Sequence, residues 1–177
     1  MTDDNKAFYT AVAVAAAAAL VALVAVAVFV HHSNEKGREY DGYAGKYFVY
    51  DVSGSSGSAT FDGTMRIEIK EVKGSTATVA YTYDIYRTIS GSRTPYLVSV
   101  LTETADLSKD DDLGIWKRYE TMSTKWGYKT VDVYLKASGG STYEWYVSRV
   151  DHNVAYKMIT TEGGVTLTYT LSKTNHF

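Results

Sequence analysis

Residues 76–86 read TATVAYTYDIY, and this stretch decides the fold class. Every second position is apolar or aromatic, whereas most of the positions between them carry Thr or Asp. Successive side chains of a β-strand point to opposite faces of its sheet. The alternation therefore predicts an antiparallel strand with one buried face and one face in water.

The same period of two recurs along the rest of the chain, for example in residues 65–70, 131–136 and 165–172. Short segments rich in Gly, Ser, Asn and Asp separate these runs and are typical of hairpin turns. We expect eight or nine strands, at residues 44–52, 60–72, 76–87, 95–104, 114–121, 128–137, 142–150, 154–160 and 165–173. Because the connections are short, strands that are neighbours in sequence are expected to pair. The predicted fold is an all-β antiparallel meander that forms a barrel or half-barrel, with a β-sandwich as the alternative.

Two segments depart from the simple alternating pattern. Residues 95–104, PYLVSVLTET, are apolar on both faces at the start, so we expect this strand to be covered on both sides or to face a ligand. Residues 53–58 read SGSSGS, which predicts a flexible loop between the first two strands.

The N-terminal part of the chain has a different composition. Residues 7–30 carry no charge, Gly or Pro. As a helix this run extends over about 36 Å, enough to cross a hydrocarbon core of about 30 Å. We therefore expect a polar tail at residues 1–6, a transmembrane helix at 7–30, a polar tether at 31–42 and the β domain at 43–177.

The side of the membrane and the processing of this segment follow from its flanks. Lys36, Arg38 and Lys46 outnumber Lys6, which by the positive-inside rule favours a cytoplasmic β domain. The Tyr-, Thr-, Ser- and Gly-rich composition of the domain is instead that of exported surface modules. Residues 25–27 form an A-x-A cleavage pattern, but the preceding tail is acidic, unlike a secretory signal peptide. The expectation is an uncleaved, single-pass signal anchor in the cell membrane with an extracytoplasmic β domain.

Composition and motifs argue against several function classes. The chain has no cysteine, which excludes disulfides and thiol chemistry, and its net charge of −2 comes without a basic stripe, so we expect no nucleic-acid partner. Neither a nucleophile elbow, a phosphate-binding loop nor an H-E-x-x-H metal motif is present. His152 is the one plausible base inside the domain. The sequence therefore predicts a protein that is not an enzyme and needs no cofactor, with a membrane-anchored enzyme of unknown class as a further alternative.

The acidic stretch DLSKDDDLG at residues 106–114 is the best candidate for a metal site. Asp110, Asp111 and Asp112 offer clustered hard-oxygen ligands, as the start of a calcium loop does. The position that needs a bidentate Glu is Thr121, and no helices are expected around the loop. A charged hairpin tip in solvent is the favoured interpretation of the stretch, so no metal site is predicted, and such charges also oppose edge-to-edge aggregation.

Aromatic residues are the remaining candidates for a binding site. Tyr and Trp offer large rigid rings with a polar atom, and such rings contact sugars, apolar molecules and proteins. The candidates are Trp116, Trp126, Trp145, Tyr43 and Tyr47. Core packing is the alternative role for each ring. The sequence thus predicts a membrane-tethered binding or interaction module whose partner is a protein, a glycan or a small apolar ligand.

Two family resemblances sharpen this expectation. The long meander at residues 43–173 resembles the half-barrels of lipocalin-like and lipoprotein-carrier proteins, which implies a lipid ligand. A short polar leader, an apolar helix and a C-terminal β domain also resemble archaeal type IV pilins. In that family a peptidase cuts after a small residue that follows a basic one, as Lys6-Ala7 before Phe8 does, which implies a filament subunit. An Ala-rich helix also packs closely against another, so copies of the chain are expected to associate.

Overall fold

The computed structural model describes residues 40–107, 112–150 and 154–177. The elements are η1 (Tyr40–Tyr43), β1 (Tyr47–Ser56), β2 (Ala59–Lys73), β3 (Thr76–Ile89), β4 (Ser92–Asp106), β5 (Ile115–Thr124), β6 (Gly127–Ser138), β7 (Ser141–Ser148), β8 (Ala155–Glu162) and β9 (Val165–Thr174). The predicted transmembrane helix at 7–30 lies outside the described residues. In the ranges that are described, no helix has the length and apolar character to cross a membrane.

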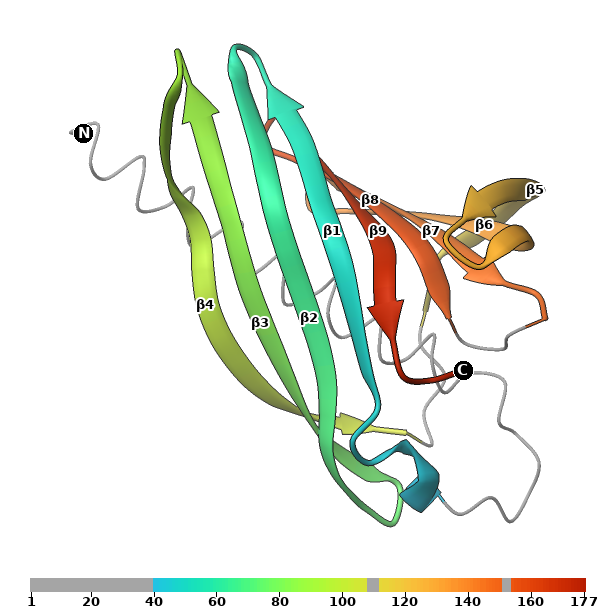
Figure 1. Ribbon diagram of the computed structural model, residues 1–177. Helices are drawn as coiled ribbons and strands as arrows, with labels where there is room; N and C mark the ends of the chain where they lie inside the picture. Colours follow the sequence, from blue (N-terminus) through green and yellow to red (C-terminus); the bar gives the residue numbers. More distant parts are fainter. Residues whose placement is uncertain (1–39, 108–111, 151–153) are drawn as a thin grey trace.

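All nine strands belong to one antiparallel sheet with the order β4-β3-β2-β1-β9-β8-β7-β6-β5. Two meanders, β1–β4 and β5–β9, are joined where the first strand pairs with the last (Figure 1). The prediction of an all-β antiparallel meander is confirmed. The sheet is not closed, because β4 and β5 lie at its opposite ends. A closed barrel and a two-sheet sandwich are therefore both wrong for this part of the chain.

The step from β4 to β5 is where the expected pairing of sequence neighbours fails. The two ends of this connection, Leu107 and Leu113, are buried. The Leu107 N–H donates to the carbonyl of Ser75, in the turn between β2 and β3. Burial of both leucines and the hydrogen bond of Leu107 hold the described ends of the connection against the rest of the domain.

One face of the sheet, here called the core face, carries the buried side chains of the first meander. In β3 the side chains of Val79, Tyr81, Tyr83 and Ile85 are at most 1% exposed. On β1 the Tyr50 hydroxyl donates to the carbonyl of Ala155 at 3.0 Å, which satisfies a buried polar group. Burial raises the pKa of Tyr50 well above its ordinary value. Aromatic rings thus supply much of the core.

The glycine- and serine-rich segment at residues 53–58 is mostly strand, which corrects the expected flexible loop. β1 continues to Ser56 and pairs with β2 on one side and β9 on the other. A side chain at Gly54 would collide with Leu167 of β9, so the glycine permits close approach of the two strands. Only Gly57 and Ser58 form the turn.

The first expectation for β4, that it is covered on both sides, is wrong, and the second, that it faces a ligand, stays a prediction. Leu97 is buried, but Val98 and Val100 are 55% and 67% exposed, so the strand is not covered on both sides. These valines lie on the outer face of the sheet, opposite Asp84 and Thr82 of β3, which are exposed as well. The apolar outer face of this strand is therefore left in water.

In the second meander both faces of the sheet are buried around β7. Trp145 and Tyr146 are adjacent, so they point to opposite faces, and they are 1% and 5% exposed. Val133 pairs with Tyr146, and Val131 and Val133 have no exposed surface. This burial confirms the prediction that the valines of residues 131–136 form the buried side of their strand.

Candidate functional site

An aromatic row crosses the second meander on the core face and ends in solvent. The strand registers place Tyr169 opposite Met158, Met158 opposite Trp145, Trp145 opposite Tyr134 and Tyr134 opposite Trp116. Directly opposed residues of antiparallel strands share a face and touch. Trp145 is 1% exposed, Tyr134 is half-buried and Trp116 is 46% exposed. The row therefore carries aromatic surface from the core to the free edge at β5.

Trp116 and Tyr119 form the exposed end of this row. Their ring centroids lie 5.4 Å apart with an angle of 57° between the ring planes. The indole Nε1–H of Trp116 donates to Oδ1 of Asp132 at 3.0 Å. Because this bond fixes the orientation of the indole, the ring face is held in place without being covered.

Asp132 also binds a cation that lies over the second ring. Its Oδ2 accepts from Nε of Arg149 at 3.1 Å, and the guanidinium carbon lies 4.8 Å from the centroid of the Tyr119 ring. The backbone N–H of Arg149 donates to the backbone carbonyl of Thr130, which fixes the position of this residue next to β6. Trp116, Tyr119, Asp132 and Arg149, together called the aromatic platform, thus restrain one another.

In the aromatic platform the negative charge of Asp132 is balanced by the positive charge of Arg149. The carboxylate of Asp132 is shared between an indole donor and a guanidinium, which satisfies both of its oxygens. On the neighbouring Tyr134, burial is the main cause that raises the pKa, and the charge of Asp132 adds to it. The tyrosine therefore stays neutral at physiological pH. The platform offers ring faces and oriented polar atoms.

The other predicted aromatic residues lie elsewhere and are less available. Trp145 sits in the core, and its buried Nε1 has no hydrogen-bond partner among the described residues. Trp126, in the turn between β5 and β6, is half-buried, and its ring centroid lies 6.0 Å from that of Tyr156 and 5.5 Å from that of Phe177. The structure therefore brings neither indole to the aromatic platform.

Tyr43 and Tyr47 lie at the start of the first meander. Tyr43 ends η1 and packs, half-buried, against the core. The Tyr47 ring is covered by Arg66, whose guanidinium carbon is 4.2 Å from the ring centroid. A cation–π contact of this kind uses the face that a ligand needs. These two tyrosines are thus engaged within the domain.

The acidic stretch is only partly described. Asp110 and Asp111 lie outside the described residues. Asp112 Oδ1 accepts from the N–H of Gly114 at 2.9 Å, and this hydrogen bond is the main reason its pKa is lowered. Its Oδ2 lies 3.4 Å from Nζ of Lys136. Within residues 40–107, 112–150 and 154–177, no group of three His, Cys, Asp or Glu side chains is placed to hold a metal.

Three members of the aromatic platform, Tyr119, Asp132 and Arg149, were missed by reasoning from the sequence. Strict alternation places residues 116 and 119 on opposite faces of a strand. The register shifts between Trp116 and Arg118, so one extra residue, Lys117, turns Tyr119 to the face of the indole. A β-bulge of this kind has no sequence signal here, apart from the spacing of two exposed aromatic residues.

Comparison of the chain with protein-family models and with curated proteins finds no match. The aromatic platform is therefore interpreted from its own geometry.

Proposed function

We propose that this protein is a membrane-tethered binding module whose β domain contacts a macromolecular partner through the aromatic platform. The observation that carries the proposal is the pair of exposed rings, with Trp116 46% and Tyr119 58% exposed, held by Asp132 and Arg149. Trp, Tyr and Arg are the residue types that most often dominate binding energy at protein interfaces.

Pre-organisation supports this function. The Trp116 ring is oriented by a hydrogen bond, and the Tyr119 ring lies under a guanidinium that is itself paired. Fixing these side chains before binding lowers the entropy lost when a partner orders them. A rigid, exposed pair of rings at the edge of a sheet suits a contact surface better than an internal packing role.

The open shape of the site favours a large partner over a small molecule. Small ligands are usually enclosed in concave pockets that bury most of their surface. The two rings instead lie on the free edge strand β5, where both are about half exposed. A protein surface or an extended glycan can cover such a site, whereas a small apolar ligand would leave much of its own surface in water.

Site-specific photo-cross-linking in native membranes tests the proposal. A photo-reactive phenylalanine analogue replaces Tyr119 in the full chain, and the same analogue replaces Tyr128 in the control. Tyr128 is 81% exposed but belongs to no part of the aromatic platform. We expect a discrete adduct from position 119 and none from position 128. Equal labelling from both positions, or none from 119, would show that the platform has no dedicated partner.

A second substitution tests whether the cross-linked partner also contacts the Trp116 ring. Trp116→Ala is expected to weaken the adduct at position 119 by about tenfold or more, since removing such an anchor costs about 2 kcal/mol of binding. Stability should change by less than about 1 kcal/mol because the ring is exposed. Denaturant unfolding of the full chain in detergent checks that the variant is folded.

A filament subunit is the second candidate, on the strength of Lys6-Ala7 before Phe8. The mass and N-terminal residue of the protein isolated from native membranes separate the two functions. A chain that begins at Met1 or Thr2 supports the uncleaved anchor. A chain that begins at Phe8 supports the filament and overturns the proposed tether.

A further inference from the structure

The two free edges of the sheet are protected to different degrees. β5 carries Lys117, Arg118 and Glu120 and a bulge at its start, devices that keep other strands from adding to an edge. In β4, residues 94–102 read TPYLVSVLT and contain no charge. Pro95 and a bulge lie near one end of β4, where the register shifts between Ile85 and Tyr86 of β3, and residues 97–102 lack such protection. Among the strands of the described residues, β4 is therefore the edge that is open to pairing.

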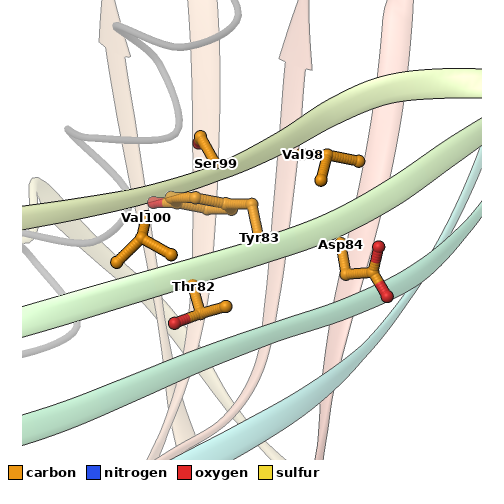
Figure 2. A pocket seen from close by; sticks show the side chains of 6 residues that line it. All are labelled: Thr82, Tyr83, Asp84, Val98, Ser99 and Val100. Carbon is orange, nitrogen blue, oxygen red and sulfur yellow. The ribbon is translucent and has the colours of Figure 1, made fainter.

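The outer face of β4 also carries unused apolar surface. Val98 and Val100 lie on one side of the strand, and Ser99 lies on the other (Figure 2). The two valines, together with Thr82 and Asp84 of β3, line a shallow depression of about 290 Å³. Both valines are more than half exposed, so a strand added beside β4 would cover apolar atoms as well as pair the free backbone groups.

We propose that β4 is a self-association edge, at which β4 of a second copy of this chain adds antiparallel about a twofold axis through Ser99. In this register Ser99 faces Ser99 of the second copy, and Val98 faces Val100. Leu97 faces Leu101 on the core face. Cross-strand pairs of β-branched side chains stabilise antiparallel sheets. An isologous contact of this kind closes as a dimer and leaves no further β4 edge free.

The distribution of charge along β4 selects a second copy in the antiparallel direction. The uncharged centre of β4, residues 94–102, has no charge that would repel the same segment of a second copy. Arg93, which also pairs with Asp62 at 2.7 Å, lies near one end of the strand, and Glu103 and Asp106 lie at the other. Antiparallel self-pairing brings the basic end of one copy toward the acidic end of the other, whereas parallel pairing brings like charges together. Pairing with β5 of another copy is opposed by the charges and the bulge of that strand.

The absence of cysteine from the chain makes disulfide cross-linking a direct test, because a single introduced thiol can bridge only two copies. Directly opposed residues have Cβ atoms about 4.5–5.5 Å apart, close to the spacing of a disulfide. In the full chain in detergent, we expect Ser99→Cys to form a cross-linked dimer on oxidation. The matched control is Thr121→Cys on the β5 edge, which should remain uncross-linked.

The register is tested by a mixture of two variants. Val98→Cys and Val100→Cys chains should cross-link to each other when mixed and only poorly when each is oxidised alone. Adding Val100→Lys to Ser99→Cys should lower the cross-linked fraction by about tenfold, since an edge lysine blocks strand addition. Association through the membrane helix alone would give Ser99→Cys no advantage over Thr121→Cys, and that result would overturn the proposal. Efficient self-cross-linking of Val98→Cys would overturn the Ser99 axis.

Discussion

The two meanders of this sheet use the same alternation of side chains in different ways. In β3 of the first meander, Tyr81 and Tyr83 are buried while Thr82 and Asp84 are exposed, so one face packs and the other meets water. In β7 of the second meander, the adjacent Trp145 and Tyr146 are both buried. The strands of the first meander are 10–15 residues long, and those of the second are 8–12 residues long.

This difference shows how one sheet can combine a meander with a polar outer face and a meander that exposes aromatic side chains for binding. Thr and Asp on the outer face of β3 end the apolar surface there. In the second meander, aromatic residues continue strand after strand along the core face until the row reaches the β5 edge at Trp116. The surface proposed to bind a partner is thus the exposed end of the core itself.

The largest expected effect comes from removing one core methionine in each meander. Met65 of β2 and Met158 of β8 both have no exposed surface. Met65→Ala and Met158→Ala should each lower the free energy of unfolding by about 2–5 kcal/mol. If the two meanders form one cooperative unit, denaturant unfolding of the full chain shows a single transition that moves in both variants. Met122→Ala, at a half-buried site, is the control and should cost less. Two separate transitions, each moved by only one variant, would show that the meanders are independent units.

An intermediate effect is expected at Gly63, in the middle of β2. Gly63 lies opposite Val52 of β1 and Ile85 of β3, and a Cβ atom there would collide with the carbonyl of Asp84. Gly63→Ala should destabilise the domain by about 1–3 kcal/mol through overpacking. Gly42→Ala, where an added Cβ meets nothing within 4 Å, is the matched control. Equal thermal shifts in the two variants would contradict a tightly packed first meander.

The smallest effect concerns an ion-pair cluster on the first meander. Hydrogen bonding to Lys70, followed by the contact with Arg66, lowers the pKa of Glu68 below its ordinary value of 4.5, although partial burial opposes this shift. A carboxyl group with a lowered pKa stabilises the fold above its unfolded pKa, and this contribution is lost as the pH falls through the folded value. Glu68→Gln should therefore cost less than about 1 kcal/mol at neutral pH.

The pH dependence provides the check on that prediction. Unfolding curves of the wild type and Glu68→Gln should begin to converge as the pH falls below 4.5 and should meet below the lowered pKa of the folded state, where Glu68 of the folded wild type is also neutral. A difference that persists unchanged in acid would mean that the substitution acts through packing, not charge. Glu120→Gln makes the matched change in the second meander, where Arg118 bonds Glu120 and also Glu144.

The strands could be predicted from the sequence because burial on one face leaves a period of two in the residues themselves. Val165, Leu167, Tyr169 and Leu171 alternate with Thr and Ser, and β9 lies where that pattern predicts. The pattern of residues does not show in the same way which strand lies at the edge of the sheet or what covers it. Val98 and Val100 read as buried because they are apolar, and only their exposed fractions in the structure, 55% and 67%, show that this face of β4 is open. The platform was partly missed because the bulge at Lys117 changes which residues share a face.

The pairing of β1 with β9 has a consequence for the order of folding. The Thr174 hydroxyl donates to the carbonyl of Tyr47, 127 positions away in the chain. The hairpins within each meander join residues that are close in sequence, whereas the pairing of β1 with β9 joins the start of the domain to its end. Contacts between distant residues close large loops and form slowly. A growing chain can therefore complete β1–β4 early, but β1 keeps one unpaired side until the last strand has been made.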